Sequence, residues 1–199
     1  GDRSGAAHIA AGTAASWALL NVPFALLAPD GWSRFFRYSA ARGSDWDSLW
    51  YVAARELEVP TVNVGVAVAL LASSALVWWA KRLREPDFPR WTLVFPLLVL
   101  FLVTGKVYSP QFSLWLLPLF ALVFPDVSMF ILFSLTEIGV FMTRYSYFNT
   151  LSGGPGMPFE SFEIAVLARA VVLVGCVVLW VLRPSTADPL TPRPPAAAA

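Results

Sequence analysis

The chain has 199 residues, of which 57 % are hydrophobic and 14 % are charged, and its net charge is +1. Soluble domains carry about 25 % charged residues, so this composition indicates an integral membrane protein, and no basic pattern points to a nucleic-acid partner. The single cysteine and the single histidine exclude a disulfide framework and a cysteine- or histidine-rich metal site. We therefore expect neither a metal ion nor another cofactor.

Six segments are apolar enough to cross a bilayer as helices, each of which needs about 20 apolar residues. In chain order they are Ile9–Ala28, Val59–Ala80, two short segments that share Trp91–Pro125, Val127–Thr143 and Phe162–Leu182. We predict an all-α, multi-pass transmembrane helical bundle over residues 1–183. The tail, residues 184–199, is rich in Pro and Ala and is predicted to be disordered. Because the sequence begins at Gly1 without a methionine, we expect the C-terminal part of a longer membrane protein.

The stretch Trp91–Pro125 is too long for one span, because a single helix of that length would measure about 52 Å against a hydrocarbon core of about 30 Å. A break near residues 106–110 divides it into two short spans. Proline disfavours helical geometry in the residue before it, so Ser109-Pro110 is the natural break. We therefore predict a tight hairpin with the sequence GKVYSPQ (105–111) at its tip.

The basic sequence KRLREPDFPR (81–90) joins the second and third predicted spans. Short loops rich in Lys and Arg remain cytoplasmic. This rule places the hairpin tip and the loops 29–58 and 144–161 on the outer face of the cytoplasmic membrane, with the C-terminus in the cytoplasm. The aromatic residues and the helical spacing within 29–58 predict helices that lie in the membrane interface.

Two ionisable residues fall within predicted spans, Glu137 in the fifth and Arg169 in the sixth. Charges at membrane depth are costly and usually mark a site, a pathway or an ion pair. Both residues are expected roughly 10 Å below the outer end of their spans, so we predict an ion pair between them. This pair either fixes helix packing or belongs to a functional site.

The hairpin tip carries the polar residues that suggest a binding site. Lys106 is a compact cation at the expected outer interface, which suits a phosphate group, and Ser109 and Gln111 add neutral hydrogen-bonding groups. Together they suit an amphiphile with a phosphate at headgroup depth and its tail in lipid. In the simpler interpretation Lys106 only snorkels to the interface, but the grouping of these residues in a break between two short spans favours a function.

The sequence GKVYSPQFSLWLLPLFAL (105–122) resembles the NK-x-x-SPQ-[YF]-x-x-W-x-x-P stretch of actinobacterial membrane glycosyltransferases of the GT-C superfamily. These are polyprenyl-phosphate-mannose-dependent mannosyltransferases of glycosyltransferase family eighty-seven and its relatives. The sequence FFRYSAARGSDWDSLWY (35–51) is similar to one of their loops before a span. The resemblance covers roughly residues 30–125, and it departs from the pattern at Gly105, where relatives often carry asparagine.

The resemblance implies a hexosyltransferase that uses a polyprenyl-phosphate sugar donor and a glycolipid or glycan acceptor on the outer face of the membrane. It implies that Lys106, Ser109 and Gln111 bind the donor phosphate, with help from Arg42 or Arg144. It also implies a carboxylate base in an early outer loop, which we expect to lie upstream of this chain. The catalytic residue is therefore not assigned, and we expect residues 1–199 alone to be inactive.

Two other functions remain open. A multi-pass transporter would use Glu137 and Arg169 as pathway residues, although no internal repeat or pair of broken helices is visible in the sequence. A non-catalytic membrane subunit would leave the polar tip unexplained.

Overall fold

A computed structural model describes residues 3–185, which are helical with no strand among them. The all-α prediction is therefore confirmed. The structure divides into two compact units, residues 1–42 and residues from Gly43 onward, where the sequence predicted a single domain over residues 1–183. Most of the tail that was predicted to be disordered, residues 186–199, lies outside the described residues.

The N-terminal unit contains two helices, α1 (Arg3–Leu27) and α2 (Pro29–Ala41). Proline suits the first position of a helix, because its fixed φ is helical and its missing N–H would have no partner there. The two helices are joined by a hydrogen bond in which Trp32 Nε1 donates to Asn21 Oδ1 at 3.1 Å. Exposed aromatic side chains on α2 agree with the interfacial helix expected in this segment.

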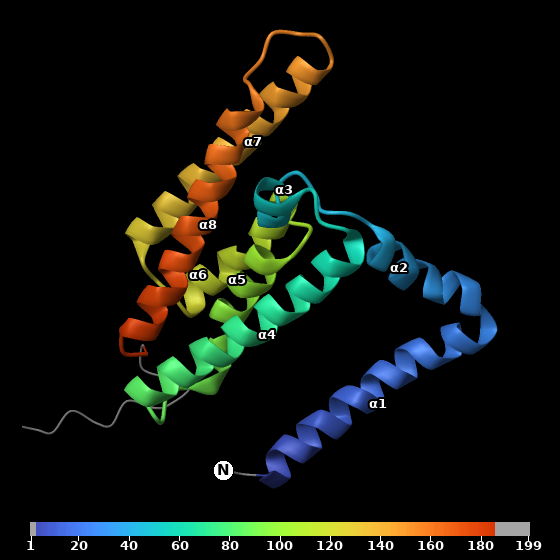
Figure 1. The fold of residues 1–199 in the computed structure, drawn as a ribbon. Helices are drawn as coiled ribbons and strands as arrows, with labels where there is room; N and C mark the ends of the chain where they lie inside the picture. The colour runs from blue at the N-terminus through green and yellow to red at the C-terminus, as the bar shows by residue number, and fades with distance from the viewer. Residues whose placement is uncertain (1–2, 186–199) are drawn as a thin grey trace, which may run out of the picture. The chain divides into compact units, whose positions relative to one another are not determined.

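The C-terminal unit contains the rest of the bundle (Figure 1). Its elements are α3 (Leu49–Ala54), α4 (Val59–Arg84), η1 (Arg90–Leu93), α5 (Val94–Thr104), η2 (Pro110–Leu116), α6 (Leu117–Leu122), α7 (Val127–Leu151) and α8 (Phe159–Leu182), where η denotes a 3₁₀-helix. Helices α7 and α8 form an antiparallel pair whose connecting loop extends beyond the other elements of this unit (Figure 1).

Within residues 3–185, four helices are long and apolar enough to cross a membrane, namely α1, α4, α7 and α8. The two shorter apolar segments, residues 90–104 and 110–122, are the arms of the predicted hairpin. The protein is thus a membrane protein whose apolar helices are suited to contact with lipid. The second and fifth predicted segments stop short of the C-terminal ends of their helices, because α4 continues to Arg84 and α7 continues to Leu151.

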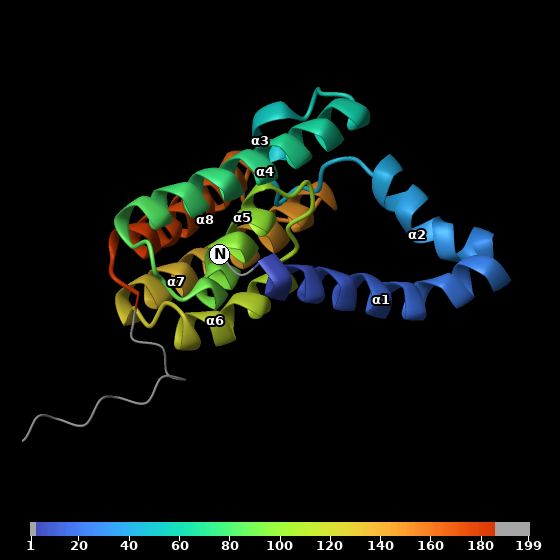
Figure 2. The same cartoon turned by 90° about the horizontal axis from the view of Figure 1, so that it is seen from below.

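Helix α5 occupies the middle of the C-terminal unit, with α4 and α8 on one side and α6 and α7 on the other (Figure 2). Its buried side chains Phe95, Val99 and Leu102 are at most 1 % exposed and belong to the main apolar core. Leu116 and Leu173 enter the same core from η2 and α8. The first arm of the hairpin is short, but its packing on several sides holds it in place.

The predicted break in the hairpin is confirmed, since α5 ends at Thr104 and η2 begins at Pro110. The second arm starts as a 3₁₀-helix of seven residues, longer than the usual three or four. Pro118 follows in the first turn of α6, and its missing N–H cannot donate to the preceding turn. The 3₁₀ rise of about 2 Å per residue lets this arm cover more depth than an α-helix of equal length.

Candidate functional site

The hairpin tip is fixed by contacts from two other elements. Lys106 is half-buried, and its Nζ donates to Asn63 Oδ1 of α4 at 2.5 Å. Its backbone carbonyl accepts from the Asp45 N–H at 2.8 Å. The cation is therefore held by α4 through its side chain and by the loop before α3 through its backbone, so it is pre-positioned at the tip.

Trp50 of α3 provides a second anchor, because its Nε1 donates to the Thr104 carbonyl at 2.7 Å. Its ring lies against Gly65 of α4, and a Cβ added at Gly65 would overlap that ring. The backbone also passes close to Gly105, because a Cβ added there would lie 2.9 Å from the Phe101 carbonyl oxygen. Glycine fits this position without a shift of the backbone. The asparagine found here in the resembled family would thus need a different local backbone.

The other residues that were predicted to bind the phosphate differ in their burial and in the unit to which they belong. Ser109 is half-buried and precedes η2, and Gln111 is exposed in the first turn of η2. Neither side chain forms a hydrogen bond with another described residue. Arg42 follows the last residue of α2 as its C-cap in the N-terminal unit, and its backbone N–H donates to the Tyr38 carbonyl.

Arg144 is not in a loop, as the sequence predicted, but within α7, and its partner is a carboxylate that the sequence analysis did not assign. Its Nη1 donates to Asp47 Oδ2 at 2.6 Å. The Asp47 side chain is fully buried, and its Oδ1, like Arg144 Nε, has no hydrogen-bond partner among the described residues. Asp47 therefore joins the loop before α3 to α7 across 97 residues of sequence.

Arg169 of α8 is the largest fully buried side chain of the described residues. Its Nη2 donates to the Asp47 carbonyl oxygen at 2.6 Å, and its guanidinium lies 3.7 Å from the centre of the Tyr108 ring. The expected ion pair with Glu137 is present, with 3.7 Å between Arg169 Nη1 and Glu137 Oε2. One guanidinium thus contacts the loop before α3, the hairpin tip and α7.

Tyr108 completes this buried polar network. Its hydroxyl donates to Glu137 Oε1 at 3.3 Å and is 3.1 Å from Ser113 Oγ. The residues of the network carry two cations and two carboxylates: Asp47, Tyr108, Ser113, Glu137, Arg144 and Arg169. Because buried charges are stable only when they are paired and hydrogen-bonded, this balance accounts for the presence of four ionisable groups inside the bundle.

A small cavity of about 10 Å³ lies within the network, lined by Asp47, Tyr108 and Arg169 together with apolar side chains. That volume is about the minimum for one water molecule. Burial raises the pKa of the Asp47 carboxyl to about 6, against the opposing effects of the Arg144 and Arg169 guanidinium groups. Asp47 is thus close to titration near neutral pH.

The intramembrane pair lies farther from the helix ends than the sequence indicated. Glu137 is about 21 Å along α7 from Leu151, and Arg169 is about 15 Å along α8 from Phe159. These distances are longer than 10 Å because α7 continues beyond Thr143 and α8 begins before Phe162, while the depth of the pair in a membrane stays a prediction. The last turns of α7 contain polar and aromatic residues, SYFNTL, which did not count as a span but continue the helix.

An apolar groove of about 320 Å³ runs between η2 and α7, starting at Pro110, the first residue after Ser109. Leu117, Ile138 and Phe141 are among the apolar side chains that line it. Three polar residues line the groove: Ser113, Ser134 and Glu137. The groove therefore borders the second arm of the hairpin and has a carboxylate in one wall.

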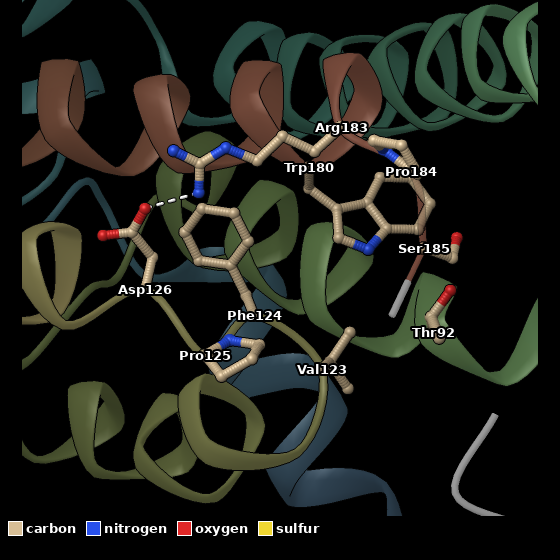
Figure 3. Close-up of a pocket in the computed structure, with 9 residues that line it drawn as sticks. All are labelled: Thr92, Val123, Phe124, Pro125, Asp126, Trp180, Arg183, Pro184 and Ser185. Carbon is tan, nitrogen blue, oxygen red and sulfur yellow. Dashed lines mark hydrogen bonds and ion pairs between the residues drawn. The ribbon is translucent and has the colours of Figure 1, made fainter. Parts of the chain in front are cut away.

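A second polar cluster, which the sequence analysis missed, lies at the opposite end of the bundle. Lys81 of α4 is 1 % exposed, and its Nζ donates to the Arg183 carbonyl oxygen at 2.7 Å and pairs with Glu85 at 2.8 Å. Arg183 pairs with Asp126, the residue that caps α7 (Figure 3). The hydrogen bond from the Met129 N–H and the Arg183 side chain hold the pKa of Asp126 below its usual value.

Comparison of the chain with models of known protein families, with curated proteins and with solved structures finds no match. The interpretation of the site therefore depends on its geometry and on the resemblance described above. Of the residues predicted from the sequence, the geometry brings Glu137 and Arg169 together beside Tyr108 of the hairpin tip, and Asp47 links Arg169 to Arg144. Lys106 is held on another side of the tip, by Asn63 of α4.

Proposed function

We propose that this chain forms the donor-binding part of a membrane glycosyltransferase that transfers a hexosyl, and specifically a mannosyl, group from a polyprenyl-phosphate sugar. The reaction takes place on the outer face of the cytoplasmic membrane, with a glycolipid or glycan as acceptor. The observation that carries the proposal is the half-buried Lys106, which Asn63 of α4 holds at the hairpin tip, together with an apolar groove lined by Pro110 of the same hairpin.

Lys106 supplies positive charge where the donor phosphate leaves. As the bond between the sugar and the phosphate breaks, negative charge grows on the phosphate oxygens, and a fixed cation stabilises that charge most in the transition state. Ser109, adjacent to the start of the groove, offers a neutral donor to the same group. The anchors at Asn63, Asp45 and Trp50 support this role, because an ordered cation does not need to be positioned during the reaction.

The polyprenyl chain of the donor lies in the groove between η2 and α7. Its apolar lining and its start at Pro110 suit a lipid tail that leaves a headgroup at the tip. The buried network below the tip is assigned a positioning role. Its charges are balanced and largely hydrogen-bonded within the protein, so it fixes the tip and the loop before α3 rather than contacting the sugar.

The proposal is tested with membranes from cells that express the full-length gene or an empty vector, supplied with radiolabelled polyprenyl-phosphate mannose. We expect labelled mannose to enter a lipid or glycan product only when the gene is expressed. The same membranes receive a labelled nucleotide sugar with synthesis of the lipid-linked donor blocked, and no label is expected in the product. Transfer that is equal with and without the gene would overturn the proposal.

The position of the lipid tail is tested with Ile138→Trp, which fills the groove with a larger side chain. We expect a several-fold rise in KM for the polyprenyl donor with little change in kcat, because the tail binds equally in the ground and transition states. Ile164→Trp is the matched control, since Ile164 is similarly exposed on α8 and does not line the groove. Equal effects of the two substitutions would exclude the groove as the tail site.

A further inference from the structure

The end of the C-terminal unit opposite the hairpin tip has a pocket that the proposed function does not use. Its volume is about 230 Å³, and it lies between the last turns of α4 and α8. Three cations and one carboxylate line it: Lys81, Arg84, Arg183 and Glu85. Val181 and Leu182 supply apolar walls beside these charges, so the pocket is amphiphilic and has an excess of positive charge.

The cations of this pocket differ in how far their charge is already compensated. Lys81 is buried, pairs with Glu85, and binds the last carbonyl groups of α8, where the negative end of the helix dipole lies. Arg183 pairs with Asp126 (Figure 3), which does not line this pocket. Arg84 is exposed and forms no hydrogen bond or ion pair with any described residue. Arg84 therefore contributes charge that the protein does not neutralise.

Aromatic side chains place this pocket at headgroup depth. Trp78, Trp79 and Trp91 are all exposed near the same end of the bundle, and tryptophan is enriched at membrane–water interfaces. The guanidinium of Arg82 lies 5.3 Å from the centre of the Trp78 ring, which adds a further cation at this level. A phosphate that binds Arg84 would thus lie at the depth where phospholipid headgroups are found.

We propose that the pocket between α4 and α8 binds an acidic phospholipid, with its phosphodiester at Arg84 and an acyl chain along Val181 and Leu182. Basic pockets between transmembrane helices on the cytoplasmic side are a known way to bind anionic headgroups. The basic sequence at residues 81–90 predicts that this end faces the cytoplasm. The bound lipid would join the ends of α4 and α8, which are otherwise connected here mainly through Lys81 and Glu85.

The test uses full-length protein purified in a neutral detergent and native mass spectrometry with phosphatidylglycerol or phosphatidylcholine. We expect phosphatidylglycerol to bind several-fold more tightly, because only its headgroup carries a net negative charge. Arg84→Gln should weaken phosphatidylglycerol binding about fivefold, the effect of one basic residue near an anionic surface. Arg55→Gln is the matched control, because Arg55 is an exposed arginine at the C-terminal end of α3, far from this pocket in the structure.

Inorganic phosphate, added in a thermal unfolding assay of the same protein, separates a lipid site from a general anion site. We expect phosphatidylglycerol to raise the unfolding temperature and millimolar inorganic phosphate to leave it unchanged. Equal binding of the two lipids, equal effects of Arg84→Gln and Arg55→Gln, or equal stabilisation by inorganic phosphate would each overturn the proposal.

Discussion

The buried charge network makes the replacement of Arg169 by methionine a sensitive test of the structure. Methionine has a similar length and no charge, so Arg169→Met removes the cation while largely filling its volume. The Asp47 carbonyl then loses a donor, and Glu137 keeps a buried negative charge without its partner. The Tyr108 ring also loses the guanidinium that lies 3.7 Å from its centre.

The magnitude of this effect follows from the geometry of the pair. Two unit charges 3.7 Å apart attract each other by about 4.5 kcal/mol at an effective dielectric constant of about 20. Removal of one partner from a buried pair typically costs about 3–5 kcal/mol, because the other charge stays buried and uncompensated. For a protein of this size, that loss lowers the unfolding temperature by about 10 °C.

The assay is thermal unfolding of the full-length protein in detergent, followed by tryptophan fluorescence. Arg55→Gln is the control, because Arg55 and its partner Glu56 are exposed and such pairs contribute at most about 1 kcal/mol. The double variant Arg169→Met/Glu137→Gln should recover part of the loss, since it leaves no unpaired charge. An unfolding temperature of Arg169→Met equal to that of the control would refute the buried pair.

Two further predictions concern the anchors of the tip. Burial raises the pKa of Asp47 from its ordinary value of 3.8 to about 6, so folding favours the protonated form. The contribution of this group to stability therefore falls as pH rises through 6. Lowering the pH from 7 to 5 should raise the free energy of unfolding of wild type by about 1 kcal/mol more than that of Asp47→Asn. Denaturant unfolding at the two pH values measures this difference, and an identical pH dependence of the two proteins would contradict it. Gly65→Ala should lower the free energy of unfolding by about 1–3 kcal/mol through overpacking and shift the tryptophan emission. Gly139→Ala is the control and should do neither, because an added Cβ there meets nothing within 4 Å. Equal effects of the two substitutions would contradict the close approach at Gly65.

The sequence was sufficient to predict the parts of the fold that depend on local composition. Span length and Ser109-Pro110 located the hairpin break, and the presence of Glu137 and Arg169 in neighbouring spans predicted their pairing. These predictions succeeded because the cost of a charge in lipid and the reach of a helix per residue are general physical constraints.

The parts that the sequence did not predict depend on contacts between distant residues. Asp47 was not assigned from the sequence, because its partner is Arg144 and no local pattern links positions 97 residues apart. Lys81 was counted with the basic loop after the second span, although α4 continues through it and turns its side chain inward. Asn63 carried a usable signal, as an amide near the start of an apolar helix on the expected outer side.

The most direct test of the proposed function is the rate of sugar transfer by full-length Lys106→Ala at saturating polyprenyl-phosphate donor. We predict a fall of about 100-fold or more, the typical effect of removing a group that stabilises transition-state charge, with partial activity in Lys106→Arg. Membrane insertion and the unfolding temperature of both variants should stay close to wild type, and Arg55→Gln should be fully active. A well-inserted Lys106→Ala protein with a rate within about twofold of wild type, well below the loss expected for such a group, would contradict the account.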